Sequence, residues 1–154
     1  MHEQMTFKRL MGIDPGEKRI GISISDPSGT ISRPLCTINN ISYAESAQKI
    51  VELCTRYEIG KIILGLSRDE DGEVTFSGRK ALRLADAIRK LIEIPVEYWD
   101  EEGTTKMAQK SRQLLGVRRK DRRGHLDDVA ACVLLQSYID NFYVKVNAKH
   151  ENQS

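Results

Sequence analysis

The sequence has little of the residue types that mark several classes of protein. Its three cysteines, Cys36, Cys54 and Cys132, are odd in number and far apart, which excludes a disulfide-rich scaffold and a CxxC zinc site. Four prolines, 11 glycines and 40% hydrophobic residues exclude a fibrous or disordered chain of 154 residues. No apolar run approaches the roughly 20 residues of a membrane span. Residues 1–8 hold no apolar signal-peptide core, so we expect a cytoplasmic protein without membrane contact.

An excess of one charge is also lacking, because 24 Lys and Arg against 22 Asp and Glu leave a net charge of +2. That sum argues against a strongly basic nucleic-acid-binding arm, but it conceals local segregation. Lys18 and Arg19 follow an acidic turn. A second basic group precedes the last helix: Arg118, Arg119, Lys120, Arg122 and Arg123. Most runs of charged residues are simply solvated surface. Both basic groups, however, lie next to acidic segments, which favours a row of phosphate-binding residues.

Hydrophobic periodicity predicts a single α/β domain over residues 1–144, followed by a polar tail over residues 145–154. Strands are predicted over residues 7–13, 20–25, 31–38, 61–65 and 96–100. Helices are predicted over residues 43–57, 81–92, 104–115 and 126–143. Tight turns make the first three strands antiparallel, and intervening helices make the last two parallel. We therefore expect a five-stranded mixed sheet with helices packed on it.

Acidic residues stand at the ends of three predicted elements. Asp14 ends the first strand, where alternation gives it the same face as Gly12. The other acids close the fifth strand and open the last helix: Asp100-Glu101 and Asp127-Asp128. Each group alone has an ordinary explanation, as a turn, a solvated strand exit or a charge suited to a first helical turn. Three acidic groups at the ends of elements of one sheet favour a ligand-binding site, because ligands bind at strand ends of this kind.

Together these segments form an oxygen-only donor set, which favours Mg²⁺ or Mn²⁺ over zinc. Carboxylates that hold two divalent ions can activate a water and stabilise the leaving oxygen of a phosphodiester. The sequence therefore predicts an acidic metal site flanked by phosphate-binding residues, with nucleic acid as the partner. Which member of each acidic pair contacts the metal stays open at this point.

Four ordered motifs within residues 10–140 resemble the YqgF/RuvX family: MGIDPGEKRIG with SDP, ILGL with DG, DE with TT, and LDDVAA with LLQSY. The resemblance implies a ribonuclease H fold, whose element order matches the prediction. It implies a Holliday-junction-resolvase-like, metal-dependent nuclease that matures precursors of small-subunit (16S) ribosomal RNA. It also implies a catalytic set of Asp14, Asp100, Glu101 and Asp127. Within that set, Asp14, Glu101 and Asp127 are the implied metal ligands.

Two positions depart from the family pattern, since Glu102 replaces a usual arginine and Ser67 a usual proline. Three functions stay open. One is a nuclease acting on structured RNA or on branched DNA, for which a homodimer is a compatible assembly. The second is a non-catalytic nucleic-acid-binding module. The third is a sugar-kinase-like ATPase, which shares the fold, although the chain is short for two domains closing over ATP.

Overall fold

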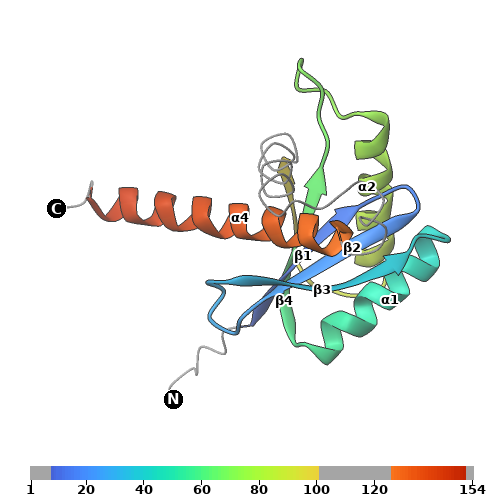
Figure 1. Ribbon diagram of the computed structural model, residues 1–154, viewed down its shortest axis with the longest axis horizontal. Helices are drawn as coiled ribbons and strands as arrows, with labels where there is room; N and C mark the ends of the chain where they lie inside the picture. The colour runs from blue at the N-terminus through green and yellow to red at the C-terminus, as the bar shows by residue number, and fades with distance from the viewer. Residues whose placement is uncertain (1–7, 101–125, 152–154) are drawn as a thin grey trace.

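The computed structural model describes residues 8–100 and 126–151, and these residues build one mixed sheet of order β3-β2-β1-β4-β5 (Figure 1). The strands are β1 (Arg9–Pro15), β2 (Arg19–Ser25), β3 (Ser32–Asn39), β4 (Ile59–Leu66) and β5 (Val96–Asp100). Antiparallel pairing joins β1 to β2 and β2 to β3, whereas β4 is parallel to both β1 and β5. The predicted five-stranded mixed sheet is confirmed. Because β1, β4 and β5 run in parallel, their carboxyl ends share one edge.

Helices cover both faces of the sheet (Figure 1). On one face, α1 (Tyr43–Arg56) and α2 (Phe76–Arg89) enclose the larger core, which includes Met11 and Ile13 of β1. On the other face, α4 (Leu126–Glu151) buries Leu134 and Leu135 against β4. In the described part of the chain, no helix is long and apolar enough to cross a membrane.

Capping residues set where the first two helices begin. Ser42 Oγ accepts a hydrogen bond of 3.2 Å from the Glu45 amide, as the predicted capping box requires. Thr75 Oγ1 accepts one of 3.0 Å from the Gly78 amide, so α2 begins at Phe76. This start is earlier than the predicted residue 81, because the prediction followed the apolar stripe and missed the cap.

Two other boundaries differ from the prediction. Strand β1 continues to Pro15, so Asp14 lies within the strand. Helix α4 continues to Glu151, past the boundary expected at residue 144, because no glycine or proline interrupts residues 126–151. Residues 145–151, expected to be a frayed tail, are therefore helical, while the domain boundaries themselves stay a prediction. The helix predicted over residues 104–115 lies outside the described residues.

Candidate active site at the carboxyl edge of the sheet

Asp14 lies near the carboxyl end of β1 and is half-buried. Its cross-strand partner in β2 is Gly21. Two residues earlier, Gly12 faces α4, since a Cβ there would lie 2.9 Å from the Ala131 carbonyl oxygen and 2.8 Å from Leu135 Cβ. Residues two apart in a strand share a face, so Asp14 also belongs to the α4 side of the sheet.

The main chain of Asp127 packs directly onto Gly21. A Cβ at residue 21 would overlap the Asp127 carbonyl group and lie 2.9 Å from the Asp128 amide nitrogen. Only glycine permits this approach of the first turn of α4 to β2. Because Gly21 is paired with Asp14, the structure brings the main chains of the Asp14 and Asp127 segments together.

Two buried serines hold α4 in this position. Ser23 Oγ donates a 2.7 Å hydrogen bond to the main-chain carbonyl of Ala131. Ser32 Oγ donates an equally short bond, 2.7 Å, to the carbonyl of Cys132. The two bonds come from β2 and β3 and reach successive peptide units of the helix. The sheet therefore fixes the position of α4 along its axis, and with it the position of Asp127.

Asp100 reaches the same edge but belongs to the other face. It is the last residue of β5 and pairs with Leu66 at the end of β4. Its neighbour Trp99 faces α4, where the indole Nε1 donates a 3.3 Å hydrogen bond to Ser137 Oγ. Strand alternation therefore directs Asp100 away from Asp14. Glu101, the other acid of this pair, lies outside the described residues.

Asp128 carries an orphaned polar atom beside this site. Its Oδ1 is buried and accepts no hydrogen bond from residues 8–100 and 126–151. Burial raises the pKa of the Cys36 thiol on β3, and the negative charge of Asp128 raises it further. A buried carboxylate oxygen without a donor is costly unless a cation compensates it, so Asp128 fits a position next to a bound cation.

Among residues 8–100 and 126–151, no three His, Cys, Asp or Glu side chains are grouped closely enough to hold a metal ion. The described part of the site therefore consists of Asp14 and the first turn of α4. Lys18, which is exposed, and Arg19, which is half-buried, lie at the turn into β2 on the same edge. The remaining predicted phosphate-binding residues lie outside the described part: Arg118, Arg119, Lys120, Arg122 and Arg123.

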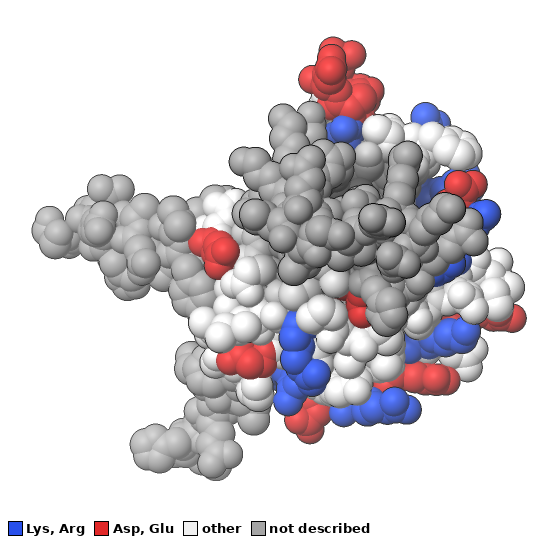
Figure 2. Space-filling model, in the orientation of Figure 1, with Lys and Arg blue, Asp and Glu red and all other residues white. Residues whose placement is uncertain are grey.

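Acidic side chains gather at the tip of the β4–α2 connection, above the sheet edge (Figure 2). The exposed members are Asp69, Glu70, Asp71 and Glu73. The connection is ordered by the Asp69 carboxylate, whose Oδ1 accepts hydrogen bonds from the amides of Asp71 (2.9 Å) and Glu73 (3.0 Å). The tip therefore carries a local negative potential, which repels a polyanion.

Comparison with known protein families shows to which family the chain belongs. The sequence model of the RuvX family, described as "Holliday junction resolvase", matches residues 8–141. The chain belongs to the RuvX family. The match begins before β1 and ends within α4, so it includes Asp14, Asp127 and the glycine-bearing strands between them.

Curated relatives of this RuvX protein carry the name "Putative pre-16S rRNA nuclease". The relative from Caldanaerobacter subterraneus subsp. tengcongensis is 34% identical over 134 residues, covering 86% of this chain and 96% of its own. The relative from Clostridium acetobutylicum is 35% identical over 133 residues, covering 86% and 98%. That from Thermoanaerobacter pseudethanolicus is 37% identical over 134 residues, covering 86% and 96%.

Solved structures show the same fold at low sequence identity. RuvC of T. thermophilus, solved with a Holliday junction substrate, has a TM-score of 0.54 and 18% identity, covering 91% of this chain and 96% of its own. The fowlpox virus Holliday junction resolvase has a TM-score of 0.50 and 16% identity, covering 86% and 99%. These likenesses confirm the expected ribonuclease H-like architecture.

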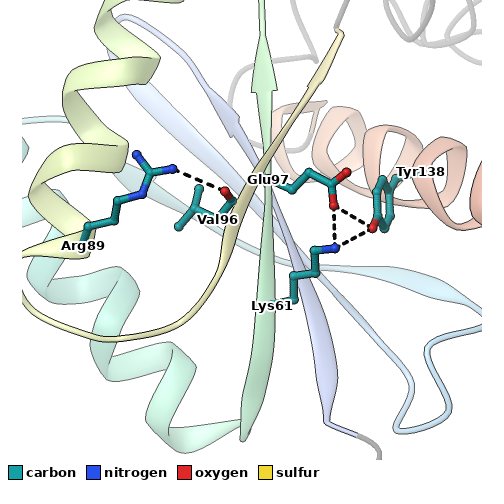
Figure 3. Close-up of polar contacts among 5 residues, drawn as sticks. All are labelled: Lys61, Arg89, Val96, Glu97 and Tyr138. Carbon is teal, nitrogen blue, oxygen red and sulfur yellow. Dashed lines mark hydrogen bonds and ion pairs between the residues drawn. The ribbon is translucent and has the colours of Figure 1, made fainter.

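Sequence reasoning missed the polar cluster at the opposite end of the parallel strands, formed by Lys61, Glu97 and Tyr138 (Figure 3). Lys61 Nζ lies 2.5 Å from Glu97 Oε2 and donates to Tyr138 Oη at 2.9 Å. Tyr138 Oη donates in turn to Glu97 at 2.9 Å. Partial burial acts to lower the pKa of Lys61, but its two hydrogen bonds raise that pKa overall. The cluster fastens α4 to β4 and β5 far from Asp14.

A second feature that sequence reasoning missed lies beside the turn that follows Asp14. Phe76 and Lys80, one turn apart on α2, line a pocket of about 340 Å³ with Pro15 and Gly16, which directly follow Asp14. The sequence offered one signal, an aromatic residue at the end of a polar loop. Its proximity to Asp14 depends on the neighbouring positions of β1 and β4, which no local pattern reveals.

Proposed function

We propose that this RuvX protein is a metal-dependent nuclease that hydrolyses phosphodiester bonds in structured nucleic acid. The observation that carries the proposal is the packing of Asp127 onto Gly21, the partner of Asp14. Two acids far apart in the chain are thereby held at one edge of the sheet. Membership of the RuvX family supports a nuclease at that edge over a binding module or an ATPase.

Asp14 and Asp127, together with Glu101, would hold divalent cations. The donors are carboxylate oxygens, which suit Mg²⁺ or Mn²⁺. The orphaned oxygen of Asp128 supports a cation beside the first turn of α4. We prefer Glu101 to Asp100 as the ligand from the β5 segment. Trp99 faces α4, so strand alternation directs Asp100 to the other face, away from Asp14.

Two divalent ions bound to these carboxylates would supply an activated water and a stabilised leaving oxygen. The protein's own groups do the rest. Asp14 is held on a paired strand and Asp127 on a helix fastened by Ser23 and Ser32, so the ligands keep their separation. Lys18 and Arg19, at the same edge of the sheet, would orient the phosphate backbone of the substrate. Fixed ligands of this kind reduce the reorganisation needed in the transition state.

We propose the precursor of 16S ribosomal RNA as the substrate. Relatives that are 34%, 35% and 37% identical to this chain are named putative pre-16S rRNA nucleases, and the alignments cover most of their length. A branched DNA is the second candidate. It is favoured by the description of the RuvX family as Holliday junction resolvase.

Purified protein incubated with Mg²⁺ and either a pre-16S RNA end fragment or a four-way DNA junction tests the proposal. We expect cleavage by the wild type and its loss in Asp14→Asn and in Asp127→Asn, with the affinity measured in parallel. Asp140→Asn is the matched control, because Asp140 is exposed on the same helix as Asp127. Cleavage that persists in Asp14→Asn contradicts the assignment. Salt-sensitive binding without cleavage by any variant, wild type included, favours the non-catalytic binding module.

A further inference from the structure

The pocket beside the Asp14 turn continues the candidate active site onto the other face of the sheet. It has a volume of about 340 Å³, and its walls come from the turn after β1, from Ser67 after β4 and from the first turns of α2. Pro15 and Gly16 in its wall are the residues that follow Asp14. The pocket is therefore joined to Asp14 through the two residues of the turn that follow it.

In the described part of the chain, Phe76 packs into neither hydrophobic core. It is the first residue of α2, and its side chain is 71% exposed. Lys80, one turn later, places its Nζ 4.9 Å from the centre of the Phe76 ring. An exposed aromatic ring with an ammonium group beside it is the combination that binds a base and its phosphate.

The ammonium of Lys80 is available to a phosphate. Among the described residues it forms an ion pair with Glu17, whose Oε1 lies 3.9 Å from Nζ, beyond hydrogen-bond distance. The Glu17 side chain is 83% exposed, so water screens this pair and an incoming phosphate competes with it easily. The hydroxyl groups of Ser67 and Ser77 in the pocket wall provide further partners for a nucleotide.

We propose that this pocket binds one unpaired nucleotide of the substrate strand next to the cleaved phosphate. The base stacks on Phe76 and the phosphate pairs with Lys80. That this nucleotide lies next to the cleaved phosphate rests on the proposed function. That the pocket binds a nucleotide at all is inferred from the Phe76 ring and the Lys80 ammonium group. Stacking on a single ring makes the site tolerant of base identity and selects an unpaired base over one held in a duplex.

Binding measured without divalent metal separates this site from cleavage. The probe is a single-stranded RNA of about 12 nucleotides, compared with a strand of the same length that lacks all its bases. We expect the wild type to bind the strand with bases about tenfold more tightly. Phe76→Ala should bind both strands equally, and Phe76→Trp should keep the preference. Lys80→Gln should keep the preference but reduce the slope of log affinity against log salt by about one.

The controls are an exposed aromatic residue and an exposed lysine away from the pocket. Phe142→Ala removes a 53% exposed ring from α4, and Lys90→Gln removes a charge at the far end of α2. Both should bind as the wild type does. The proposal is overturned if the wild type binds neither strand or shows no preference for bases. It is equally overturned if Phe76→Ala keeps the preference or Phe142→Ala loses it. Base-dependent binding through Phe76 without cleavage in Mg²⁺ supports the nucleotide site and contradicts the nuclease.

Discussion

The hydroxyl of Ser23 and the main-chain carbonyl of Ala131 are joined by a buried hydrogen bond of 2.7 Å across 108 residues of sequence. Ser23 lies two residues after Gly21, and Ala131 lies one turn after Asp127. The bond therefore fastens α4 where the helix carries Asp127 over the strand pair that holds Asp14. The geometry of the site depends on small residues of β1 and β2 as much as on the acids.

Gly21→Ala should displace the first turn of α4 and destabilise the fold by about 1–3 kcal/mol, as overpacking does. The added methyl group would overlap the Asp127 carbonyl. We expect a lower urea midpoint and a loss of Mg²⁺-dependent cleavage. Gly72→Ala is the control. It is strained by a φ of +82° but meets no neighbouring atom, so it should cost stability and leave cleavage intact. Full cleavage by Gly21→Ala would contradict the role assigned to this contact.

Lys18→Gln should weaken nucleic-acid binding and reduce its salt dependence by about one unit of slope, if Lys18 contacts a single phosphate. Lys18 is exposed at the turn between β1 and β2, directly beside the Asp14 edge. Filter binding or fluorescence anisotropy over a range of salt concentrations measures this slope. Lys49→Gln on α1 should bind as the wild type does, and an equal effect of both changes would refute a local phosphate contact.

The turn between β2 and β3 should be sensitive to acid because of Asp26. Hydrogen bonds from the Ile31 amide, the Ser28 hydroxyl and the Thr30 amide lower the pKa of Asp26 from 3.8 to about 2. The ionised form therefore stabilises the fold above about pH 4, and this contribution is lost as the pH falls from about 4 towards 2. Thermal unfolding should show Asp26→Asn less stable than the wild type at neutral pH. The difference should shrink below pH 4, and a constant difference would contradict the assignment.

Cys54 should resist alkylation in the folded protein. It is 2% exposed, and burial raises the pKa of its thiol to about 12, so almost no thiolate exists near neutral pH. Cys36 and Cys132 are half-buried and should react before it. Mass spectrometry after timed iodoacetamide labelling measures the order. Denaturant should make all three thiols react together, and early labelling of Cys54 in native protein would refute its burial.

The sheet is predicted well from the sequence because turn residues bound its apolar runs, and residues 20–25 alternate apolar with small or polar side chains. The pattern placed Asp14 on the same face as Gly12, and the contact of Gly12 with Leu135 of α4 confirms the face to which both belong. The sequence predicts too short a final helix, because the polar composition after residue 144 is typical of a frayed end. Helix propensity without an interrupting residue extends it to Glu151.

The sequence could not resolve contacts that depend on the order of strands. The Phe76 pocket forms because β4 lies beside β1, which places the start of α2 next to the Asp14 turn. Nor could composition show that Asp100 lies on the face opposite Asp14, which required the bond from Trp99 to Ser137. The roles of Glu101 and the basic run from Arg118 to Arg123, and assembly as a homodimer, stay predictions.

Helix α4 is one uninterrupted rod of 26 residues, roughly 39 Å long at 1.5 Å per residue. Its first half is fastened to the sheet, while its last turns extend past the sheet towards the C-terminus (Figure 1). If this helix moves as a rigid body, a force on its projecting C-terminal end is transmitted to Asp127 in its first turn. The hydrogen bonds from Ser23 and Ser32 oppose that movement. Any tilt that overcomes them moves a carboxylate of the candidate metal site at the same moment.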